Sequence, residues 1–232
     1  MKFGEGINSS GRIPLSLHAP LSLAFSLNKG VAMAFTFFFR DLPVIEYAVE
    51  HAVHFASGRM RFKVWDAGSA MGQETYTIAI VLAEKMGKFA FKNLRLNATD
   101  YDSANHFGDV LKNAVYHYDE LKRMPPEYFA KYFEPADKPD HFRVTEILRN
   151  QVSFEYHDLL SLKPIGTDYS LIVCKNVLLH FQHAQRVDVI KMFHQALLTG
   201  GYFTTEHTQK LPAEVSHLFE QVVPNSQLFR KL

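Results

Sequence analysis

The stretch FKVWDAGSAMG at residues 62–72 decides the fold of this chain. Its first six residues predict a short strand, and the remainder is a turn with a glycine at each end. Beyond the turn, apolar residues recur with helical spacing from Gln73 to Met86, and Gly87 is a suitable C-terminal stop. A strand, a tight turn and a helix in this order are the first half of a βαβ unit.

The same alternation continues on both sides of this stretch. Apolar strands that alternate with helices of ten to fifteen residues are typical of a mostly parallel sheet with helices on both faces. We therefore predict an α/β fold of this kind, and an irregular arm at residues 1–33 ahead of a domain at 34–232. Strands are expected at 94–100, 152–156, 170–174, 202–205 and 227–232, and helices at 37–56, 103–113, 127–132 and 184–198.

The composition is that of an ordinary globular protein. The chain has 232 residues, of which 47% are apolar and 21% charged, and its formal net charge is +1. This balance gives no strong field to attract nucleic acid or anionic lipid, so we expect neither as a partner. No stretch approaches the roughly 20 apolar residues of a membrane helix, and no membrane insertion is expected. The single cysteine, Cys174, excludes an intramolecular disulfide and favours a cytoplasmic location.

Metal, hydrolase and nicotinamide chemistry lack their sequence patterns. The 12 histidines include no H-E-x-x-H or other close metal-binding spacing, so no metal site is predicted. No G-x-S-x-G stretch is present. The turn at 68–72 has the spacing G-x-x-x-G rather than G-x-G-x-x-G, which disfavours a nicotinamide-dependent oxidoreductase.

Polar residues accompany the carboxyl ends of four predicted strands, which is where ligands bind in open parallel sheets. Glu74 lies in the first helical turn after the glycine turn, and Asp100, Asp158 and Asn176 end or follow later strands. An acid at Glu74 would attract an ammonium group and repel a pyrophosphate. It would also complement the helix dipole with no ligand present, and on this residue alone the simpler interpretation is favoured.

The other three residues also have plain alternatives. Asp100 can accept two hydrogen bonds from a ribose diol, or it can cap the next helix; Asp102 is available as a cap too, and the two interpretations of Asp100 remain even. Asp158, which two leucines follow, suits the amino group and ring of adenine, or it is a loop aspartate. Asn176 brings polar atoms to the same edge of the sheet.

In this order, the residues resemble those of class I S-adenosylmethionine methyltransferases, and the closer resemblance is to the CheR-type chemotaxis receptor glutamate methyltransferases. Residues 65–79, WDAGSAMGQETYTIA, are similar to that family's W-x-A-x-x-x-x-G-E-E-P-Y-S-I-A signature. Shorter matches are TFFFRD at 36–41 with T-x-F-F-R-D/E, ATDYD at 98–102 with A-S/T-D-I-D, and CKNVLLHF at 174–181 with C-R-N-V-x-I-Y-F. The resemblance extends over residues 34 to 232.

The resemblance implies a Rossmann-like fold with an antiparallel final strand, S-adenosylmethionine as cofactor and S-adenosylhomocysteine as product. Glu74 would hold the methionine ammonium, Asp100 the ribose hydroxyls, and Asp158 the adenine. Arg40 and His180 would lie at the methyl-transfer site, where His180 stands at the position of a family Tyr. The residues implied at the cofactor are Thr36, Arg40, Ala67, Gly68, Glu74, Asp100, Asp158, Leu159, Asn176 and Val177.

The function that the resemblance implies is O-methylation of protein glutamates, with a chemoreceptor or a related signalling protein as partner. The alternative is a non-catalytic CheR-like module that binds the cofactor or its product and regulates a signalling partner. The family's small N-terminal helical domain would not fit before Thr36. Many members also grip a receptor tail with a Gly-rich loop, and residues 109–165 contain no glycine. The sequence further departs from the family pattern at Ala34, Gln73, Thr75 and Asp158.

Overall fold

The structure, a computed structural model, describes residues 36–102, 106–208, 210–222 and 224–232. The arm expected at 1–33 lies outside these residues. From Thr36 to Leu232 the chain forms one unit, built around a seven-stranded sheet in the order β6-β2-β1-β7-β8-β10-β9. Its strands are β1 (Phe62–Ala67), β2 (Leu94–Asp100), β6 (Val152–Tyr156), β7 (Tyr169–Val173), β8 (Leu197–Thr204), β9 (Phe219–Gln221) and β10 (Leu228–Lys231).

The sheet reverses its strand order next to its central strand. Strands β6, β2, β1, β7 and β8 are parallel to one another, whereas β10 runs antiparallel to β8 and to β9. The chain passes outward from β1 through β2 to β6 and then returns to β7 on the other side of β1. A crevice at the carboxyl ends of the strands is expected at such a switch point. The predicted α/β fold, with a mostly parallel sheet and an antiparallel final strand, is confirmed.

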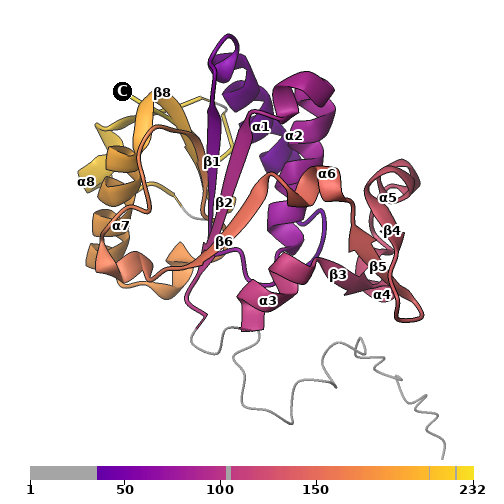
Figure 1. The fold of residues 1–232 in the computed structure, drawn as a ribbon. Helices are drawn as coiled ribbons and strands as arrows, with labels where there is room; N and C mark the ends of the chain where they lie inside the picture. The colour runs from indigo at the N-terminus through magenta and orange to yellow at the C-terminus, as the bar shows by residue number, and fades with distance from the viewer. Residues whose placement is uncertain (1–35, 103–105, 209, 223) are drawn as a thin grey trace, which may run out of the picture. The chain divides into compact units, whose positions relative to one another are not determined.

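Helices cover both faces of the sheet (Figure 1). Helices α1 (Leu42–Ala56) and α2 (Gln73–Phe91) lie on one face and α7 (His183–Ala196) on the other, while α3 (His106–Asn113) packs beside β6 and α8 (Ala213–Ser216) beside α7. Neighbouring side chains of β1 point to opposite faces, so Val64 joins the core under α1 and α2 and Trp65 joins the core under α7. Among the described residues, no helix combines the length and the apolar character needed to cross a membrane.

A small antiparallel sheet, in the order β3-β5-β4, lies beside α2 (Figure 1). The edge-to-face rings of Tyr116 and Phe133 contact the fully buried Phe38, at centroid distances of 4.9 and 5.7 Å. These strands have no counterpart among the strands predicted from the sequence. No glycine is needed in their hairpin because Asp140 adopts the left-handed φ of 56°. The elements here are β3 (Val115–His117), α4 (Tyr118–Leu121), α5 (Pro126–Tyr132), β4 (Phe133–Pro135), β5 (His141–Val144) and α6 (Glu146–Arg149).

Several predicted helix ends are wrong. The helix expected at 37–56 begins only at Leu42, because Phe39 and Asp41 have positive φ angles of 61° and 50°. The stop expected at Gly87 is confirmed as a break in the helical geometry (φ 74°), although a further helical segment of α2 continues from there to Phe91. The last residues expected in the 184–198 helix belong to β8 instead. The start of the helix expected at 103–113 lies outside the described residues.

Candidate functional site

The turn between β1 and α2 is strained and closely tied to β2. Gly68, Ala70 and Gly72 have φ angles of 107°, 46° and 92°, which two glycines tolerate without cost. The N–H groups of Gly68 and Ser69 both donate to the carbonyl oxygen of Thr99, at 2.8 and 3.0 Å. These bonds hold the turn against the carboxyl end of β2. Helix α2 therefore begins with its N-terminal N–H groups at this edge of the sheet.

Asp100 ends β2 and holds the same turn. Its Oδ2 accepts a hydrogen bond from the N–H of Ala70 at 2.7 Å. Burial raises the pKa of the Asp100 carboxyl, and hydrogen bonds from the backbone of Ala70 and Tyr101 oppose this shift. The capping role falls to Asp102, which accepts hydrogen bonds from the N–H groups of His106 and Gly108 in α3. Asp100 is therefore not required as a cap.

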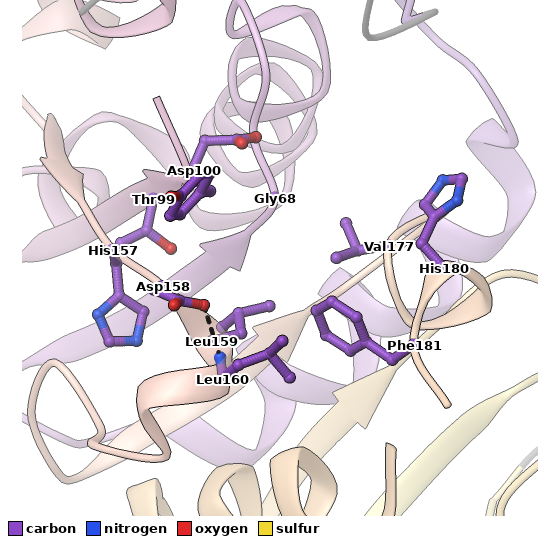
Figure 2. A pocket seen from close by; sticks show the side chains of 11 residues that line it. Gly68, Thr99, Asp100, His157, Asp158, Leu159, Leu160, Val177, His180 and Phe181 are labelled. Carbon is purple, nitrogen blue, oxygen red and sulfur yellow. Dashed lines mark hydrogen bonds between the residues drawn. The ribbon is translucent and has the colours of Figure 1, made fainter. Parts of the chain in front are cut away.

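A cavity of about 440 Å³ opens at the carboxyl ends of β1, β2 and β6 (Figure 2). Gly68 and Asp100 line it on one side, and Asp158 and Leu159 line it where β6 ends. In the short helix η2 (Leu159–Ser161), the N–H of Leu160 donates to Asp158 Oδ1 at 2.8 Å. The remaining wall comes from the segment after β7. The complete lining is Gly68, Thr99, Asp100, Tyr101, His157, Asp158, Leu159, Leu160, Val177, His180 and Phe181.

The segment after β7 closes the cavity opposite β2 (Figure 2). Val177 packs so closely on the turn that a Cβ built on Gly68 would overlap its Cγ2 atom. Helix η3 (Leu178–His180) follows, and His180 is exposed at its end while lining the cavity. Asn176, which precedes Val177, has a left-handed φ of 58° and does not line the cavity.

A buried ion-pair cluster lies at the start of α2. Lys175 Nζ is fully buried and contacts Glu74 Oε2 at 3.1 Å and Asp41 Oδ2 at 3.2 Å. It also donates to the carbonyl oxygen of Arg40 at 3.4 Å. Burial raises the pKa of the Glu74 carboxyl, and the positive charge of Lys175 opposes the shift. Lys175 therefore joins Glu74 to the segment before α1.

The segment before α1 contacts α2 but not the cavity. Thr36 is the first described residue and is half-buried. The N–H of Phe39 donates to Thr77 Oγ1 in α2 at 3.0 Å, and the Arg40 guanidinium lies over the ring of Phe37. Neither Thr36 nor Arg40 lines the cavity. Arg40 does lie near Glu74, because its charge is one of the influences that lower the pKa of that carboxyl.

A second buried carboxyl lies within β1 itself. Asp66 has no exposed surface, and its Oδ2 accepts a hydrogen bond from the hydroxyl of Thr75 at 2.5 Å. Its Oδ1 has no hydrogen-bond partner among the described residues. Burial, reinforced by the negative charge of Glu74, raises the pKa of Asp66 well above its ordinary value. A proton on Asp66 therefore relieves the repulsion between two buried carboxylates.

The structure brings most of the predicted residues to one edge of the sheet. Those that line the cavity are Gly68, Asp100, Asp158, Leu159, Val177 and His180. The others lie outside its lining: Ala67 is buried at the end of β1, Glu74 is paired with Lys175, and Thr36, Arg40 and Asn176 lie in neighbouring segments. The sequence analysis assigns no role to Lys175. The signal in the sequence that could have identified Lys175 is its charge directly after an otherwise apolar strand.

Metal chemistry finds no support in the described part of the chain. No group of three or more His, Cys, Asp or Glu side chains there is arranged to hold a metal ion. The comparisons with known proteins point elsewhere. Residues 34–227 match the model of the family "CheR methyltransferase, SAM binding domain". This chain belongs to the CheR methyltransferase family.

Relatives within the family include the chemotaxis protein methyltransferases of Escherichia coli K12 and Salmonella typhimurium LT2. Each is 29% identical to this chain, over 79% and 75% of it respectively. The match spans 62% and 59% of the two relatives, which is less than two thirds of their length. Among solved structures, a TehB-like SAM-dependent methyltransferase from Corynebacterium glutamicum is similar with a TM-score of 0.43 and 17% identity. That match covers 79% of this chain and 85% of the other.

The residues of the site fit S-adenosylmethionine, the cofactor of the family's domain. The cavity volume lies in the range of small-molecule sites, and its wall combines apolar side chains with the Asp100 carboxylate. A carboxylate accepts hydrogen bonds from a diol, and the carboxylate of Glu74 attracts an ammonium. Lys175 is fully buried and pairs with Glu74, which fixes the position of that carboxylate.

We predict that Gly68→Ala destabilises the protein and abolishes cofactor binding. The new methyl group would overlap Val177 Cγ2, and alanine is strained at a φ of 107°, which costs on the order of 1–3 kcal/mol. Gly166→Ala is the matched control, because its Cβ would meet no atom closer than 3.5 Å. Urea unfolding and calorimetry with S-adenosylhomocysteine measure both effects. Equal behaviour of the two variants would contradict the close packing of Val177 on this turn.

We predict that the stability of the Asp66→Asn variant, relative to that of the native chain, increases as pH rises. The folded-state pKa of Asp66 lies above its unfolded value, so the folded state binds more protons, and stability falls as pH rises from about 4 to the folded-state pKa. The variant lacks this loss, which amounts to at most about 1.4 kcal/mol per pH unit. Urea unfolding of both proteins between pH 4.5 and 8 gives the difference; a difference independent of pH would show that Asp66 is not buried as a carboxyl.

Proposed function

We propose that this chain is a cytoplasmic S-adenosylmethionine-dependent O-methyltransferase that acts on glutamate carboxylates of a protein, with a chemoreceptor or a related signalling protein as partner. The observation that carries the proposal is the single cavity shared by the turn after β1, Asp100 and the segment after β7. The family and the names of its relatives support methylation in chemotaxis. The assignment of roles to individual residues is part of the proposal.

In this proposal each end of the site has its own binding groups. Asp100 accepts hydrogen bonds from the ribose hydroxyls, and Asp158 with Leu159 contacts the adenine. Glu74 binds the methionine ammonium, Lys175 holds Glu74 in position, and Arg40 approaches the methionine part of the cofactor. When bound, the cofactor supplies an electrophilic methyl group. Val177 and Asn176 fix the end of the site where that group is presented to the acceptor.

A carboxylate acceptor explains why the site needs no general base. A glutamate side chain, with a pKa of about 4.3, is already ionised at neutral pH. The protein must align the acceptor with the methyl group and exclude water, because the positive charge of the sulfonium and the negative charge of the carboxylate both disappear as the methyl group is transferred. His157 and His180 line the cavity, and burial lowers the pKa of His157. Neither ring has to accept a proton, so we assign His180 to acceptor alignment.

We predict base-labile methyl ester formation on a chemoreceptor cytoplasmic fragment. Labelled S-adenosylmethionine is incubated with the chain and the fragment, and the label released as methanol after mild base is counted. A fragment whose methylation-site glutamates are replaced by glutamine is the control and should release none. Binding of S-adenosylhomocysteine with no ester on any receptor fragment would reject the enzyme and leave the non-catalytic cofactor-binding module.

We predict that Asp100→Ala weakens binding of S-adenosylhomocysteine by roughly 1–3 kcal/mol, which is the cost of leaving ligand hydroxyls unpaired. Asp137→Ala, on the exposed turn before β5, is the control. Calorimetry measures both, and circular dichroism verifies that the variants are folded. If the dissociation constant of Asp100→Ala equals that of the control, Asp100 is not part of the ribose site.

A further inference from the structure

Glu206 is a buried acid outside the lining of the cavity. It follows β8 by two positions and is only 4% exposed. Its Oε2 accepts two hydrogen bonds, from the N–H of Asn176 at 2.9 Å and from the hydroxyl of Thr205 at 2.7 Å. The first bond joins the carboxyl end of β8 to Asn176, the residue before Val177, which lines the cavity.

The backbone at Asn176 needs such a partner. Its φ of 58° is in the left-handed region, which a residue with a side chain enters at a cost that the surrounding structure must offset. A hydrogen bond from its N–H to a buried carboxylate is charge-assisted and stronger than one to a neutral acceptor. The Glu206 carboxylate is therefore placed to hold this turn in its unusual conformation.

Glu206 is itself fixed from the side of β10. The carbonyl oxygen of Gln227, the residue before β10, accepts two hydrogen bonds. The N–H of Thr205 donates at 3.2 Å and the hydroxyl of Thr204 at 3.0 Å. With its backbone held by β10 and its side chain aligned by Thr205, the carboxylate has little freedom to move.

The turn that Glu206 holds leads directly into the cavity wall. Val177 follows Asn176 and fills the space against Gly68, and the N–H of His180 donates to the carbonyl oxygen of Val177 at 3.0 Å. A change of backbone conformation at Asn176 would therefore move Val177 away from Gly68 and displace His180 with it. These are the contacts that bound the proposed methyl-transfer end.

We propose that Glu206 is a positioning residue of the cofactor site, which acts through the backbone of Asn176 to hold Val177 and η3 against the turn after β1. This rests on the proposed function only for the identity of the ligand. The hydrogen bond from Asn176 and its consequence for the cavity wall do not depend on what the cavity binds.

Two substitutions separate this role from general stability. In Glu206→Gln the amide oxygen can still accept from Asn176 and Thr205, and the amide nitrogen takes the place of Oε1, which has no hydrogen-bond partner among the described residues. Glu206→Ala removes the acceptor. Glu134→Ala, exposed on β4, is the control. If Glu206→Ala fails to fold, Thr205→Val, which removes only the bond that aligns the carboxylate, replaces it.

We predict that Glu206→Ala, or Thr205→Val in its place, weakens S-adenosylhomocysteine binding, by tenfold or more for the alanine variant. Glu206→Gln should remain within threefold of the native chain. In nitrogen-15 spectra without ligand, the amide resonance of Asn176 should shift in Glu206→Gln, which loses the charged acceptor, and shift further in Glu206→Ala. Amides of the small sheet should not move. Calorimetry and these spectra are recorded on folded protein at the same pH.

A native-like dissociation constant in Glu206→Ala, with lower thermal stability alone, would overturn the proposal and leave Glu206 a structural residue. An Asn176 amide that does not shift in either variant would overturn it as well. If the native chain itself does not bind S-adenosylhomocysteine, the proposed function fails instead, and the amide shifts still decide whether Glu206 holds the turn.

Discussion

The burial of several carboxylates at one edge of a parallel sheet is the constraint on which the rest of this structure depends. Asp66, Glu74 and Glu206 are buried, and Asp100 is largely so. The thiol of Cys174 lies among them: burial raises its pKa most, and the negative charges of these four groups raise it further. Buried charge is costly unless it is paired.

The chain meets this cost in three different ways. Glu74 pairs with the buried ammonium of Lys175, Asp100 and Glu206 accept backbone N–H groups, and Asp66 is relieved by a raised pKa. Of these four acids, only Asp100 lines the cavity among the described residues, so its carboxylate is the one that faces a bound ligand directly.

The fold was largely predictable from the sequence, whereas its irregular parts were not. The strand at 62–67 lies next to a glycine turn and is followed by apolar residues with helical spacing, which are local signals. The strands of the small sheet are three or four residues long, which is too short for a period to be recognised. Their position follows from packing on Phe38, a contact between distant parts of the chain.

The site shows the same division between local and long-range information. Position after a strand was enough to select Asp100 and Asp158, because parallel strands deliver their carboxyl ends to one edge. It could not reveal that Lys175 would turn inward to Glu74, because both orientations of a strand-end side chain are compatible with the sequence. Nor could it reveal Glu206, whose partner is a backbone N–H in a left-handed turn 30 residues away. Residues proposed to bind by their side chains were visible as a pattern, whereas Lys175 and Glu206, which contact other parts of the protein, emerge only from the folded contacts.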